Sequence, residues 1–259
     1  MSIVRTGPVL GLAGQLALLA MLAGTTGLGI AGWLAGAGSG VVTWAALTRG
    51  LRRSGTPALG PADRVTLTRA TLAGAVAALT ADSLGRHVPV AVLVTLAAVA
   101  LVLDAVDGRV ARCTGTASRL GARFDMEVDA FLILVLSAYA AGRLGSWVLT
   151  IGLMRYGYLA AGWALPWLRG PLPPRQWPKV VAATQGVVLV VAAADLLPRP
   201  LLSAATAVAL ALLIGSFGRD VGWQWWHRPT GPGGYGLAVA RSGQHPYPAA
   251  ARVPEASRA

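Results

Sequence analysis

The sequence has few charged residues and very few acids. Only 12% of its 259 residues are charged, about half of the roughly 25% that is usual in soluble globular domains. Hydrophobic residues make up 55% of the chain and come in long blocks, a pattern typical of several transmembrane helices. This composition argues against a soluble globular protein.

Cysteine and histidine are scarce as well. The single cysteine, Cys113, excludes an intramolecular disulfide framework. The three histidines are scattered through expected loops, so the sequence does not support a histidine metal site. The shortage of acids leaves a net charge of +12. The arginines cluster between apolar blocks, which indicates cytoplasmic loops beside anionic lipid and no nucleic-acid partner.

Eight apolar blocks are each long enough, or nearly so, for one helical span of about 20 residues. They cover residues 8–24, 28–47, 65–82, 88–107, 124–142, 146–168, 179–197 and 200–217. We predict an all-α, polytopic transmembrane helical bundle whose first block is a retained span and not a cleaved signal peptide. The loops 49–64, 108–123 and 169–179 are rich in basic residues, and an even number of spans then places both termini with them in the cytoplasm. We expect a bacterial plasma-membrane protein.

Three regions follow from this pattern. They are an N-terminal transmembrane hairpin with a basic loop (1–60), a six-helix membrane domain (61–222), and an interfacial tryptophan segment with a disordered cytoplasmic tail (223–259). Gly32, Gly36 and Gly40 recur at four-residue spacing in the hairpin. This spacing either lets another helix approach closely or reflects the abundance of glycine in the chain.

Five of the ten acids lie in one short stretch. Asp104 and Asp107 are separated by three residues, and Asp125 and Asp129 by four, so each pair shares one face of a helix. The apolar segments beside these pairs are too short to cross the hydrocarbon layer alone, which places the carboxylates within the spans. Carboxylates this close repel unless cations neutralise them, and hard divalent ions prefer oxygen ligands. We predict a site for two Mg²⁺ or Mn²⁺ ions, with Arg112 near enough to bind phosphate.

This stretch resembles the motif D-x2-D-G-x2-A-R-x8-G-x3-D-x3-D of the CDP-alcohol phosphatidyltransferase family. The matching residues are Asp104, Asp107, Gly108, Ala111, Arg112, Gly121, Asp125 and Asp129. Upstream, Asp63, Thr66 and Arg69 resemble the family's N-x2-T-x2-R opening, with Asp63 in place of the usual asparagine. Downstream, Lys179 and Gln185 stand where members often carry a basic residue and a glutamine. The resemblance covers about residues 61–218.

The resemblance implies a membrane phosphatidyltransferase that moves a phosphatidyl group from CDP-diacylglycerol to a small alcohol, a polyol or polyol phosphate, and releases CMP. It implies that the four motif aspartates hold the two ions and that Asp129 is also the general base. The donor would be bound by Thr66, Gly108, Ala111, Arg112 and Gly121. The resemblance further suggests a homodimer.

Three basic residues are candidates for binding the acceptor: Arg155, Lys179 and Arg219. Arg155 interrupts the sixth span, so it either binds an acceptor phosphate or extends to the membrane interface. Two other functions remain open from the residues alone. One is an intramembrane, Mg²⁺-dependent prenyltransferase, and the other is a metal or ion transporter, although a transporter would distribute its acids along several spans.

Overall fold

The computed structural model describes residues 6–54, 60–114, 118–170 and 177–227, and no strand occurs among them. The helices are α1 (Thr6–Thr26), α2 (Ile30–Ser54), α3 (Pro61–Asp82), α4 (Val90–Thr114), α5 (Arg119–Leu144), η1 (Ser146–Val148), α6 (Leu149–Ala164), η2 (Pro166–Arg169), α7 (Trp177–Ala194) and α8 (Arg199–Trp226). Each predicted apolar block coincides with one α-helix, so the predicted all-α bundle is confirmed. The helix α8 continues past the predicted boundary at residue 222, and residues 228–259 lie outside the described part.

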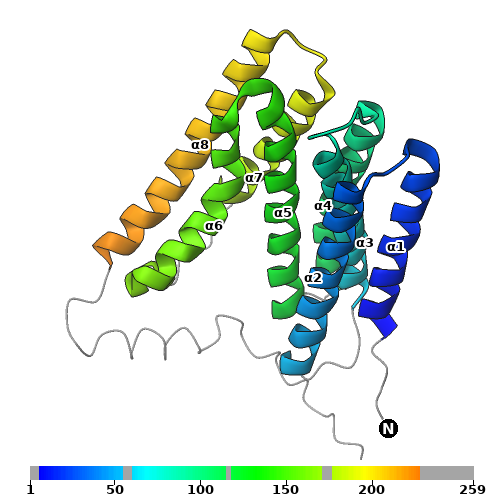
Figure 1. The fold of residues 1–259 in the computed structure, drawn as a ribbon. Helices are drawn as coiled ribbons and strands as arrows, with labels where there is room; N and C mark the ends of the chain where they lie inside the picture. Colours follow the sequence, from blue (N-terminus) through cyan, green and yellow to red (C-terminus); the bar gives the residue numbers. More distant parts are fainter. Residues whose placement is uncertain (1–5, 55–59, 115–117, 171–176, 228–259) are drawn as a thin grey trace, which may run out of the picture.

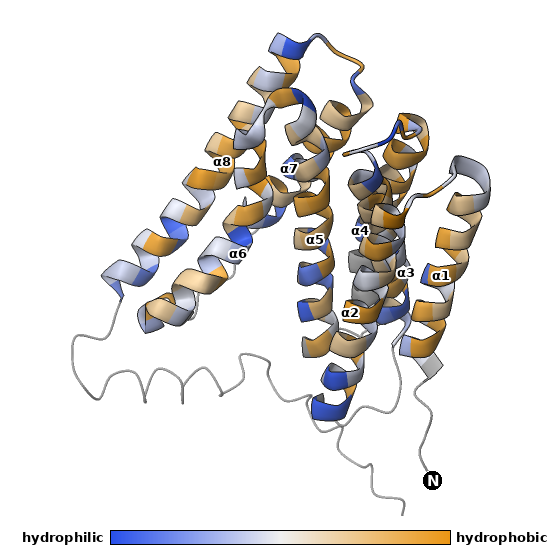
Figure 2. Ribbon diagram, viewed as in Figure 1, coloured by the Kyte–Doolittle hydropathy of each residue, from blue (hydrophilic) through white to orange (hydrophobic). Residues whose placement is uncertain are grey.

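Consecutive helices form up-and-down pairs. The α1–α2, α3–α4, α5–α6 and α7–α8 connections lie at the upper end of the bundle in Figure 1. The helices α2 and α8 finish at the lower end, where Figure 2 shows hydrophilic residues beneath the apolar bodies of the helices. Arg52 and Arg53 belong to the last turn of α2 at this end. The basic residues at the end of α2 therefore lie at the end of the bundle where α2 and α8 finish, and the predicted basic loops fall partly outside the described residues.

Four of the described helices are long and apolar enough to cross a membrane by length and composition. They are α1, α2, α7 and α8, while the apolar part of α4 is shorter and covers Val90–Val106. The helices α3, α4 and α5 carry charged side chains inside the bundle, and α6 is interrupted by Arg155. These charged residues shorten the uninterrupted apolar segment of each helix. That α3, α4, α5 and α6 also cross the membrane stays a prediction. It is supported by their packing among the apolar helices.

The helix α3 lies at the centre of the bundle. It packs against α1 and α2 on one side and against α4 and α5 on the other. Small residues make this possible, since Ala73, Ala75 and Ala78 are completely buried and bring neighbouring backbones close together. The helices α6 and α7 then pack against α5, and α8 packs against α7. The side of α3 that faces α4 and α5 thus lies deep in the protein.

The glycine stripe of α2 is a packing surface. A Cβ atom at Gly32 would lie 3.0 Å from the Ala78 carbonyl oxygen, and one at Gly36 would lie 3.1 Å from the Ala78 Cβ. At Gly40 it would lie 2.9 Å from Cγ of Gln15 in α1. The glycine spacing therefore marks close helix packing, the first of the two readings that the sequence left open.

Asp82 fastens the hairpin to the core at the upper end. Its buried carboxylate accepts hydrogen bonds from the backbone N–H of Gly29 (2.6 Å) and of Gly32 (2.9 Å), which lie at the start of α2. The preceding Gly27 has a φ of +69°, which glycine adopts without strain and which turns the chain between the two helices. A carboxylate from α3 thus supplies the N-terminal cap of α2.

Candidate functional site

The helices α4 and α5 bring three of the predicted carboxylates together. One oxygen of each of Asp104, Asp125 and Asp129 lies within 4.8 Å of the other two, which is close enough for all three to bind one metal ion. The side chains are partly open, with 41%, 36% and 33% of their surfaces exposed, respectively. The four-residue spacing of the two α5 aspartates places both on one face of the helix, as the sequence predicted, and both meet Arg69 of α3.

Local sequence fixes the start of the two helices that border the site. Ser118 caps α5 by accepting a hydrogen bond of 2.8 Å from the Gly121 N–H. At the start of α3, the Asp63 carboxylate accepts a hydrogen bond of 3.0 Å from the Gly60 N–H, as in a capping box. Asp63, which stands in place of the usual asparagine, therefore has a structural role as a helix cap.

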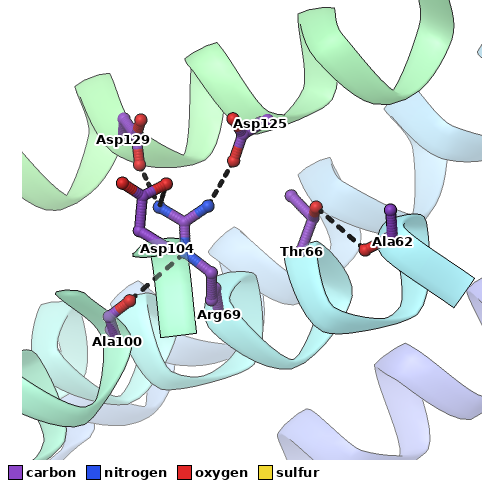
Figure 3. A network of polar contacts seen from close by, with 7 residues as sticks. All are labelled: Ala62, Thr66, Arg69, Ala100, Asp104, Asp125 and Asp129. Atoms are coloured by element: carbon purple, nitrogen blue, oxygen red, sulfur yellow. Dashed lines mark hydrogen bonds and ion pairs between the residues drawn. The ribbon is translucent and has the colours of Figure 1, made fainter. Parts of the chain in front are cut away.

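Arg69 of α3 occupies the centre of the carboxylate cluster (Figure 3). Its Nη1 pairs with Asp125, and its Nη2 pairs with Asp129 and lies 2.9 Å from Oδ1 of Asp104. Its Nε donates a hydrogen bond of 3.2 Å to the carbonyl oxygen of Ala100 in α4. The residue is 0% exposed, so its charge is neutralised by these partners and not by water. In the sequence, Arg69 is a basic residue inside a predicted span, which is itself a sign of function.

The described cluster retains a negative charge. Three carboxylates against one guanidinium leave a formal charge of minus two. Carboxylate oxygens that converge from two helices and remain partly exposed are the ligand type that Mg²⁺ and Mn²⁺ prefer. The residues present therefore fit a divalent ion.

The predicted donor-binding residues are placed only in part. Thr66 is buried one turn before Arg69 on α3, and its hydroxyl donates a hydrogen bond of 3.2 Å to the Ala62 carbonyl oxygen. Gly121 packs tightly at the start of α5, because a Cβ atom there would overlap Oδ1 of Asp63. Four further residues belong to the helix α4, but their side chains lie outside the described part of the structure: Asp107, Gly108, Ala111 and Arg112.

The three acceptor candidates differ in their surroundings. Lys179, exposed at the start of α7, is near enough to Asp104 to interact electrostatically with it. Arg219 of α8 lies 6.0 Å from the ring centroid of Trp177, which begins α7. The Nη2 of Arg155 lies 2.5 Å from Oε1 of Glu127, an α5 residue outside the aspartate cluster. Lys179 is thus the candidate with a direct electrostatic link to the carboxylates.

The comparisons with known proteins agree with this geometry. A family model described as CDP-alcohol phosphatidyltransferase matches residues 61–216, which is more than half of the chain. The protein therefore belongs to the CDP-alcohol phosphatidyltransferase family, whose members transfer a substituted phosphate group from a CDP-alcohol and depend on a metal ion. No curated protein and no solved structure matched the chain. The match begins at the first residue of α3, so the α1–α2 hairpin precedes the family region.

Proposed function

We propose that this protein transfers a phosphatidyl group from CDP-diacylglycerol to a small alcohol, either a polyol or a polyol phosphate, and releases CMP. The observation that carries the proposal is the convergence of Asp104, Asp125 and Asp129 inside a membrane bundle of this family. Lys179 beside Asp104 supports an acceptor or a donor that carries negative charge. The polarity of the helix ends supports an active site at the cytoplasmic face of a bacterial plasma membrane.

The proposed reaction is a direct displacement at phosphorus. The acceptor hydroxyl oxygen forms a bond to the lipid-linked phosphorus, and the bond from that phosphorus to the oxygen of CMP breaks. Asp129 accepts the hydroxyl proton, and CMP leaves with the electron pair of the broken bond. Basic side chains at this end of the bundle, with Lys179 first among them, bind the phosphate groups and keep them in line.

Divalent ions would be held by Asp104, Asp125 and Asp129, together with Asp107 of the same motif. When bound, two Mg²⁺ or Mn²⁺ ions would neutralise the diphosphate and stabilise the charge that develops on CMP. The residues themselves supply the negative charge that attracts such ions, since Arg69 compensates only one of the three described carboxylates.

The experiment that tests this function is an acceptor panel. Purified protein in lipid receives Mn²⁺ and CDP-diacylglycerol with glycerol phosphate, inositol phosphate, inositol, serine or a second phosphatidyl lipid, and CMP release is measured. We expect CMP with one of these acceptors and none without an acceptor. Absence of CMP with every acceptor would overturn the proposal, and release of pyrophosphate from a prenyl diphosphate would indicate the prenyltransferase instead.

Asp129→Asn tests the role of Asp129 as the base. We expect a loss of kcat of roughly 100-fold or more, since general bases contribute about 10²–10⁴-fold, while donor binding falls much less. Asp195→Asn is the matched control, because Asp195 pairs with Arg143 outside the aspartate cluster. Turnover by Asp129→Asn at the rate of this control would contradict the assignment.

A further inference from the structure

We infer that Arg69 is a positioning residue that holds the carboxylates of Asp104, Asp125 and Asp129 in the geometry that binds a divalent ion. This inference rests on the proposed function, because it concerns the same metal site. Arg69 lies on α3, whereas its partners lie on α4 and α5. One side chain therefore connects all three helices that border the site.

The orientation of Arg69 is fixed from the side of the protein interior. Its Nε is bound to the Ala100 carbonyl oxygen, and the whole side chain is buried, so the guanidinium plane has little freedom to turn. The aspartates, in contrast, are each about one third exposed or more. The guanidinium thus has a fixed position among the three carboxylates, whose side chains remain partly exposed.

The contacts of Arg69 with the three aspartates include one oxygen of each carboxylate. It contacts Oδ1 of each of the three aspartates, and a carboxylate has a second oxygen that can still bind a cation. A planar guanidinium presents five donors in a fixed geometry and can orient three carboxylates at once, whereas an ammonium group is a compact charge on a flexible stem. The arrangement therefore orders the ligands without filling their coordination capacity.

Removing Arg69 could change the affinity for a divalent ion in either of two opposite directions. If Arg69 were only a competing positive charge, its removal would strengthen the binding of a divalent ion by Coulomb attraction. If it positions the ligands, its removal lets three neighbouring carboxylates move apart and weakens the binding. We expect the second effect to dominate, because Arg69 is the fixed partner that the three aspartates share.

The test measures Mn²⁺ binding directly, without substrate. Purified protein with Arg69, Arg69→Lys or Arg69→Gln is titrated with Mn²⁺ by electron paramagnetic resonance, and the thermal midpoint is recorded in parallel to identify the folded fraction. We expect both variants to bind Mn²⁺ about 10-fold more weakly or worse, the usual effect of losing a residue that orients metal ligands. Arg69→Lys retains the charge, so its loss of affinity isolates the contribution of geometry.

Arg143→Gln is the matched control, since it removes another ion pair of α5, to Asp195, away from the cluster. We expect it to bind Mn²⁺ as the unchanged protein does. Equal or tighter binding by Arg69→Gln in its folded fraction would overturn the inference. Failure of the unchanged protein to bind Mn²⁺ would instead count against the metal site of the proposed function, so the two failures are distinguishable. Should Arg69→Gln not fold, Arg69→Lys decides by the same measurement.

Discussion

Gly152 is the point where α6 approaches the backbone of α5. A Cβ atom at this position would lie 2.5 Å from Cα of Leu134 and 3.1 Å from Oγ of Ser137. Because Leu134 Cα is a backbone atom, Gly152→Ala requires the two helices to move apart. Overpacking of this kind costs about 1–3 kcal/mol, and the higher helix propensity of alanine returns up to about 1 kcal/mol. We expect a net loss of about 1–2 kcal/mol in the free energy of unfolding.

Gly157 of the same helix provides the control, because a Cβ atom there would meet nothing within 4 Å. Gly157→Ala should be neutral or should stabilise by up to about 1 kcal/mol. At roughly 2–4 °C per kcal/mol for a chain of this length, the thermal midpoints of the two variants should differ by about 2–12 °C.

The assay is thermal unfolding of both variants in one detergent, followed by circular dichroism at equal scan rates. The comparison depends on the difference between the variants, so detergent effects common to both cancel. Equal midpoints would refute the reasoning, because they would show that α5 and α6 are not packed as closely as the structure describes.

Two further predictions concern the ends of α3. At its start, the Asp63 cap is tested from α5: Gly121→Ala should lower the free energy of unfolding by about 1 kcal/mol relative to Gly142→Ala, also in α5, because the new methyl group displaces the Asp63 carboxylate from its cap. Equal thermal midpoints would contradict this. At its other end, Asp82→Ala should cost about 2–4 kcal/mol and Asp82→Asn less, since alanine leaves two N–H groups of the α1–α2 hairpin without their acceptor. Detergent unfolding measures both Asp82 variants, and stability equal to that of the unchanged protein would show that the cap contributes nothing.

The helices were predictable because long apolar blocks report burial in lipid or in a bundle directly. All eight blocks became helices, and the largest differences occur where polar residues extend a helix beyond its apolar part, as in α2 and α8. Asp82 illustrates what could not be predicted. Its carboxylate binds N–H groups some 50 residues away in sequence, and tertiary capping of this kind leaves no local pattern. In the sequence, Asp82 is only an acid at the end of the apolar block 65–82.

The carboxylate site was predictable for a different reason. Its members lie at short spacings on two consecutive helices, so helix geometry alone places Asp125 and Asp129 on one face. Arg69 comes from a third helix, and its contacts with the aspartates span 35 to 60 residues of sequence. A spacing argument cannot establish such contacts. The same limit applies to the acceptor candidates, whose surroundings depend on where α6, α7 and α8 pack.

The hairpin before the family region is part of the same packed body as the site. The helix α3 carries Arg69 toward α4 and α5, and its opposite side carries Gly74, where a Cβ atom would lie 2.6 Å from Oγ of Ser39 in α2. Asp82 connects α3 to the hairpin at the upper end, and Leu47 and Leu51 of α2 pack against residues of α3 and α5 at the lower end. Both ends of α3 are therefore held by the hairpin while its middle is enclosed. Because Arg69 belongs to α3, the hairpin packs against the same helix that connects the three aspartates.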